Sequence, residues 1–95
     1  MLNFLEMAEK VAVRHNADNV FDYIQLTPEY SVFEIVPMDS WINKTIEQVA
    51  VRTKYHISIL ATKKGDNIRP LPKADYVFTK GEHLIVFGRK EDVFK

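Results

Sequence analysis

The residue of this chain best suited to hold a ligand is Arg52, which lies with a second cation, Lys54, at the end of a predicted helix. Cations at this position oppose the negative end of the helix dipole. They come just before residues 57–61, which are too apolar for a strand with one face in water, so we expect that strand inside a sheet or against a partner. A guanidinium fixed beside a buried strand edge can hold a small anion, and we expect the function of the chain to lie there.

Metal binding and catalysis are not indicated by the other reactive side chains. His15, His56 and His83 are far apart and show none of the pairings at three or four residues that a metal site uses, and a zinc site needs three or four converging ligands. The chain has no cysteine, its carboxylates do not pair, and its three glycines are isolated, so no phosphate-binding glycine loop can form. We therefore predict that the domain is not an enzyme and binds no metal.

Composition limits the kind of partner. The 95 residues suffice for one core, and 13 basic side chains balance 13 acidic ones. Binding to DNA, RNA or a membrane face rests on many cations, so we expect no nucleic acid polymer as partner. No apolar run approaches the ~20 residues of a membrane span, and no signal peptide is recognisable, so we expect no membrane insertion. The absence of cysteine suits the cytoplasm.

The first half of the chain alternates between helical and extended patterns. Residues 2–15 carry apolar side chains at spacings of three and four, which predicts an amphipathic helix, and residues 20–24 fit either a strand or a single helical turn. Residues 30–37 alternate as a strand that Pro37 closes. A helix capped at Asn43 or Thr45 is then expected through about Thr53, with Thr45 and Gln48 in the positions of a capping box.

The second half reads mainly as strands. We expect a central strand at 55–62, a turn at 63–67, and a return at 67–71 that its prolines confine to a sheet edge. A brief extended piece at 76–78, a second interior strand at 83–88 and a helical turn at 90–94 follow. This order predicts an α+β sandwich with one layer of helix on one sheet.

One candidate site emerges from this arrangement. If the helix and the central strand pack antiparallel, Ile46 and Ala50 approach Ile59, and Arg52 lies at the rim of an apolar slot. The alternative from the residues alone is helix-on-sheet packing with a solvated arginine.

Four segments of the chain together resemble the C-terminal domain of RCK proteins, which regulate potassium conductance, and in particular the cytosolic gating subunit of Ktr-type potassium transporters. They are VFDYIQL at 20–26, YSVFEI at 30–35, VRTKYHISI at 51–59 and GEHLIVFG at 81–88. The resemblance implies a βαβββ-type sandwich at residues 19–95 that binds a ligand and dimerises. Residues 1–18 would be the helical tail of a preceding nucleotide-binding domain.

The resemblance also implies a ligand and its site. Ktr-like members bind cyclic di-AMP in the dimer cleft, which inactivates potassium uptake by the membrane subunit. By the matched positions, the resemblance implies that adenine is contacted by Ile46, Ala50, Ile59 and Pro72. It implies that Arg52 binds a phosphate and that Ser58, at the start of the strand, forms a hydrogen bond to the ligand. The domain would be cytoplasmic and peripheral to a membrane transporter.

Two alternatives to that function stay open. Ala50 stands where the family often has a carboxylate, and Ser58 where it usually has an asparagine, which favours a purely structural dimerisation module. The sandwich architecture also allows a sensor of another small molecule, for example an amino acid.

Overall fold

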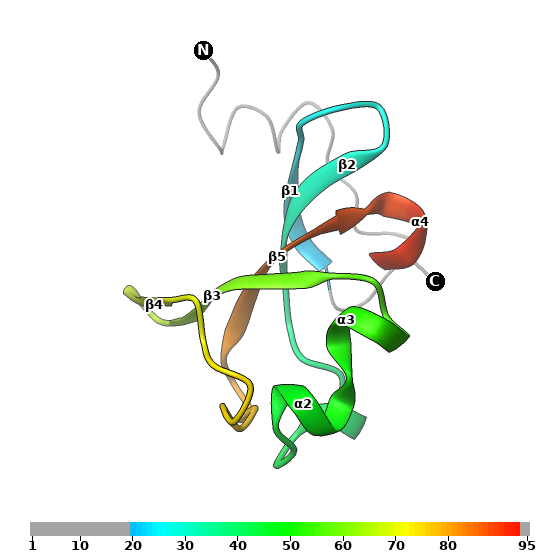
Figure 1. Ribbon diagram of the computed structural model, residues 1–95. Helices are drawn as coiled ribbons and strands as arrows, with labels where there is room; N and C mark the ends of the chain where they lie inside the picture. Colours follow the sequence, from blue (N-terminus) through cyan, green and yellow to red (C-terminus); the bar gives the residue numbers. More distant parts are fainter. Residues whose placement is uncertain (1–19, 94–95) are drawn as a thin grey trace.

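A five-stranded antiparallel sheet organises residues 20–93, the part of the chain that the computed structural model describes (Figure 1). The strands lie in the order β1-β2-β5-β3-β4; they are β1 (Val20–Gln25), β2 (Tyr30–Ile35), β3 (Ser58–Lys64), β4 (Asn67–Pro70) and β5 (His83–Arg89). Short helices make up the rest: η1 (Asp39–Trp41), α2 (Ile46–Val49), α3 (Val51–Lys54) and α4 (Lys90–Val93). The predicted α+β class is confirmed.

The sequence pattern of the strands matches their places in the sheet. β3 and β5 are interior strands, as predicted, and β4 pairs only with β3 at an edge. Along β2 and β5 every second residue is buried, because side chains alternate between the two faces of a strand. Residues 20–24, for which the sequence allowed either a strand or a single helical turn, belong to strand β1. The predicted helix at 2–15 and the boundary at residue 18 lie outside the described residues.

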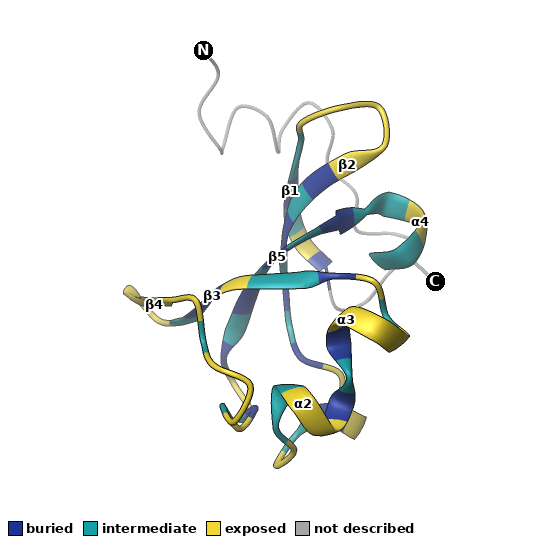
Figure 2. Ribbon diagram, in the orientation of Figure 1, coloured by how far each residue is buried: buried dark blue, intermediate teal, exposed yellow. Residues whose placement is uncertain are grey.

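The strand expected inside the sheet, β3, does lie between β5 and β4, but its Leu60 is exposed. A β-bulge falls between Ile59 and Ala61, so Leu60 is an extra residue opposite β5 and is 37% exposed. Ile57 and Ala61 are buried as expected. In Figure 2, the residues of β5 are buried or half-buried, whereas those of β4 are exposed.

The prediction of a single helix through about Thr53 is wrong, because the helix is broken in two. Ala50 takes a left-handed conformation with φ 58° and ψ 51°, which ends α2 and starts α3. The capping box at the start of α2 is confirmed: the Gln48 N–H donates to the Thr45 hydroxyl at 3.0 Å, and the Thr45 N–H donates to the Gln48 side chain at 2.9 Å.

The segment after β4 packs against the start of α2 by backbone hydrogen bonds. The Asn43 N–H donates to the Phe78 carbonyl, and the Phe78 N–H donates to the Lys44 carbonyl, both at 2.9 Å. Phe78 is thereby buried against Trp41 beneath the helices. Within residues 20–93, no helix is long and apolar enough to cross a membrane.

Candidate functional site

The candidate site lies where α2, α3, the first residues of β3 and the segment after β4 meet. Two of the N–H groups that a helix start leaves free hold this segment in place: Ile46 donates to the Tyr76 carbonyl and Glu47 to the Ala74 carbonyl, both at 3.0 Å. Pro72 and Ala74 are thus carried to Ile46, although some 26 residues separate them in the sequence.

These elements line a cavity of about 320 Å³ that opens to solvent. Its lining consists of Ile46, Val51, Arg52, Ser58, Ile59, Pro72 and Ala74. Five of the six residues expected to form a site therefore share one hollow, although their roles toward a ligand stay a prediction.

Ala50, the sixth residue, does not line this cavity. It lines a neighbouring one of about 280 Å³, together with Glu47 and Thr53. Ile46, Val51, Arg52 and Ala74 border both hollows, so the two form adjoining parts of one surface. The left-handed turn at Ala50 lies between α2 and α3, and Val51 and Arg52, which follow it, border both hollows.

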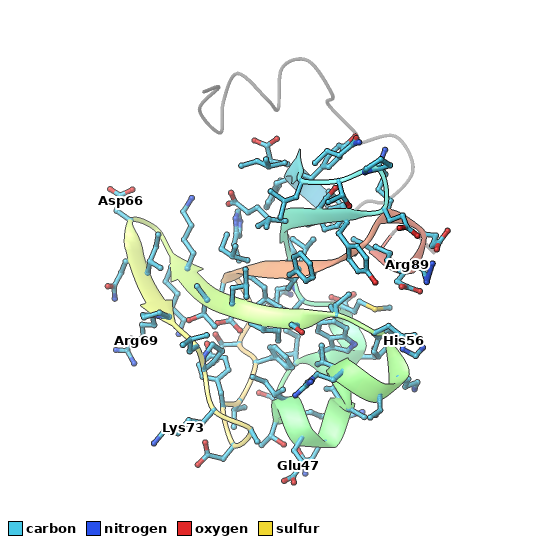
Figure 3. The ribbon with its side chains drawn as sticks, turned by 45° about the horizontal axis from the view of Figure 1, so that its top comes forward. Glu47, His56, Asp66, Arg69, Lys73 and Arg89 are labelled. Carbon is cyan, nitrogen blue, oxygen red and sulfur yellow. The ribbon has the colours of Figure 1, made fainter. Side chains whose placement is uncertain are left out.

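The charge distribution of the site favours an anion with an apolar body. Arg52 is exposed at the end of α3, and no described carboxylate forms a salt bridge with it. Ser58 adds a hydroxyl that can donate or accept a hydrogen bond. Ile46, Ile59 and Pro72 are half-buried and supply apolar walls. In Figure 3 the charged Glu47 and Lys73 lie farther out, on the edge formed by α2 and the segment after β4.

Four lining residues of the two hollows were missed by sequence reasoning: Val51, Ala74, Glu47 and Thr53. Val51 was missed because, in an unbroken helix, Ala50 rather than Val51 would face the central strand. The break itself has no signal in the sequence. Ala74 reaches the site through non-local hydrogen bonds, one of which its carbonyl accepts from Glu47. Glu47 itself was assigned no role, because a carboxylate on a helix is most often solvated.

Within residues 20–93 no group of three or more histidine, cysteine or acidic side chains is placed to hold a metal.

Comparisons with known proteins now define the relatives of the chain. The TrkA-C domain family matches residues 31–95. Ktr system potassium uptake protein C of Bacillus subtilis (strain 168) is 34% identical over 88 residues, which are 93% of this chain and 40% of that protein. Ktr system potassium uptake protein A of the same organism is 32% identical with the same coverage. The chain thus spans about 40% of the length of these relatives.

Solved structures share the fold. The RCK C domain of the potassium transport protein KtrA, in complex with cyclic diadenosine monophosphate, superposes with a TM-score of 0.61 at 25% identity, over 66% of this chain and 74% of that one. The GsuK channel bound to NAD gives a TM-score of 0.60 at 26% identity, over 66% of this chain and 12% of that one.

Proposed function

Because the chain belongs to the TrkA-C domain family, we propose that it is the regulatory RCK C-terminal domain of a Ktr-type potassium uptake system. In this proposal two copies form a homodimer, bind cyclic di-AMP in the cleft between them, and thereby inhibit transport. The domain carries no catalytic role and works in the cytoplasm, on a membrane subunit reached through the full-length protein.

The observation that carries the proposal is the convergence of Ile46, Arg52, Ser58, Ile59 and Pro72 on one cavity. Apolar walls suit a purine, and burying it contributes about 25 cal/mol per Å² before the cost of immobilisation. The guanidinium suits a phosphate, because its fork of donors matches phosphate oxygens. A relative of the same fold was solved with cyclic diadenosine monophosphate, which supports this choice of ligand.

Symmetry explains why the domain would act as a pair. Cyclic di-AMP has two equal halves, each with one adenine and one phosphate, and a two-fold dimer offers the same patch twice. Each protomer then binds one half, so one Arg52 per chain supplies two guanidiniums for two phosphates.

Calorimetric titration of the chain with cyclic di-AMP tests the proposal. The Arg52→Ala variant is expected to bind at least about tenfold more weakly, because a hydrogen bond to a charged group contributes roughly 1.5–3 kcal/mol. Light scattering is expected to find both proteins dimeric. The matched control is Arg69→Ala, which removes an exposed arginine on the edge strand β4, outside both hollows, and is expected to bind like the wild type.

Equal affinity of wild type and Arg52→Ala would contradict the assigned phosphate contact. A stable dimer that does not respond to cyclic di-AMP would instead favour the structural dimerisation module, for which Ala50 and Ser58 are the motivating residues.

A further inference from the structure

Another cavity, of about 230 Å³, lies away from the proposed cyclic di-AMP site and shares no residue with either of the two hollows there. Its walls come from the end of β2, from η1, from the turn between α3 and β3, and from α4. Figure 1 shows α3 and α4 on the same side of the molecule, to the right of the sheet. The lining is mostly apolar, as expected of a ligand cavity.

Aromatic rings form one wall of this cavity. Trp41 and Tyr55 both line it and meet edge to face, with ring centroids 5.1 Å apart. Trp41 is only 3% exposed, yet its indole Nε1 finds no hydrogen-bond partner among the described residues. A buried donor without an acceptor is costly, and a ligand oxygen is one group that can satisfy it.

Two opposite charges border the same cavity. Lys54 stands at the end of α3 and is exposed, whereas Asp92 stands on α4 and is half-buried. A purely apolar ligand would use neither charge, and a simple acid or amine would use only one. A zwitterion with an apolar side chain complements both.

We propose that this cavity binds an apolar α-amino acid. The side chain of the ligand packs against Trp41 and Tyr55, its carboxylate accepts from the Lys54 ammonium, and its ammonium donates to the Asp92 carboxylate. A carboxylate has about four lone-pair sites, so Asp92 can accept this bond beside others it makes. The volume also suits a small ligand, since an apolar cavity of about 150 Å³ already holds benzene.

The chain offers a direct reporter for the test, because Trp41 is its single tryptophan. L-leucine is titrated into the full 95-residue chain while tryptophan emission is recorded, beside 3-methylbutylamine, which lacks the carboxylate, and 4-methylpentanoate, which lacks the ammonium. We expect leucine to change the emission saturably. Each analogue is expected to need about tenfold higher concentration, because each loses one charge-assisted hydrogen bond.

Charge-removing variants identify the contacts. Lys54→Gln is expected to weaken leucine binding about tenfold and to leave 3-methylbutylamine binding unchanged, and Asp92→Asn is expected to weaken leucine while sparing 4-methylpentanoate. Lys80→Gln and Asp66→Asn, both exposed and outside the cavity, serve as controls that bind leucine normally. Circular dichroism verifies that each variant is folded.

The proposal is overturned if leucine, isoleucine, methionine and phenylalanine all fail to give a saturable change in the full chain. It is also overturned if leucine binds Lys54→Gln and Asp92→Asn as well as it binds the wild type. Neither result depends on cyclic di-AMP, which contacts no residue of this cavity in the proposed function, so the two proposals fail or succeed separately.

Discussion

Glu82 is a carboxylate with none of its surface exposed, and it is held by two donors. The Tyr76 hydroxyl donates to one carboxylate oxygen, and the Thr79 N–H donates to the other at 2.8 Å. A buried charge is tolerated only with such partners. Because the Tyr76 carbonyl also accepts from Ile46, the Glu82 cluster anchors the segment that closes the candidate site.

The same contact gives the fold a specific dependence on pH. Burial raises the pKa of Tyr76 above its ordinary value of 10.0, and the hydrogen bond to Glu82 and the negative charge of Glu82 raise this pKa further. Below pH 10 the tyrosine keeps its proton in both the folded and the unfolded state, so the stabilisation is fully present. Above pH 10 the unfolded state releases the proton first, so the free energy of unfolding falls as pH rises through the folded-state pKa.

Urea unfolding between pH 7 and pH 11 measures this effect. We expect Tyr76→Phe to reduce the decrease of the free energy of unfolding between pH 10 and pH 11, because the titrating hydroxyl is gone. We also expect it to lower the free energy of unfolding at pH 7 by about 1–3 kcal/mol, because Glu82 loses a donor. Tyr30→Phe, at an exposed tyrosine that stacks on Phe87, is the control and should keep the wild-type slope. Identical slopes in wild type and Tyr76→Phe would refute the assignment.

At the scale of elements, the break between α2 and α3 is what shapes the candidate site. Alanine is strained in the left-handed region, where its Cβ crowds the following carbonyl oxygen, at a cost of roughly 1–2 kcal/mol. Glycine has no Cβ and adopts this conformation freely. The chain holds Ala50 there because its N–H still donates to the carbonyls of Ile46 at 3.0 Å and Glu47 at 3.1 Å.

Replacing Ala50 by glycine is therefore expected to stabilise the domain. The relief of strain outweighs the larger unfolded-state entropy of glycine, for a net gain of about 0.5–1 kcal/mol. Ala74→Gly is the comparison, since Ala74 has no positive φ and should lose stability instead. Thermal unfolding followed by circular dichroism measures both, and a lower melting temperature for Ala50→Gly would contradict the account.

The elements that local sequence determines were predictable, and those that depend on distant contacts were not. The capping box at Thr45 and the edge strand with its prolines were read correctly because both are local patterns. The break at Ala50 and the bulge at Leu60 carry no local signal and arise from packing. Of the six expected site residues, five line one cavity and Ala50 lies beside it, and their roles toward a ligand stay a prediction. Val51 and Ala74 were not anticipated in the lining, and Ala74 reaches it through a long-range hydrogen bond.

At the scale of the whole molecule, apolar side chains remain exposed beside the proposed cleft. Leu60 and Leu71 adjoin the lining residues Ile59 and Pro72, and Leu71 is 73% exposed. The Leu71 N–H donates to the Leu60 carbonyl at 2.7 Å and holds Leu71 at a positive φ of 48°. A chain of 95 residues hides only about 60–65% of its unfolded surface, so a second copy covering these side chains would add to its stability.

The proposed homodimer predicts a melting temperature that depends on protein concentration, because a dimer that unfolds to two chains is favoured by mass action. A hundredfold rise in concentration is expected to raise the melting temperature by roughly 5 °C. Leu71→Asn should remove much of this dependence, since asparagine tolerates the positive φ but supplies no apolar surface to a partner. Leu26→Asn, at a residue 56% exposed in the distant turn between β1 and β2, should keep it. A melting temperature independent of concentration in the wild-type chain would show that these leucines face water, and that one copy is the stable form.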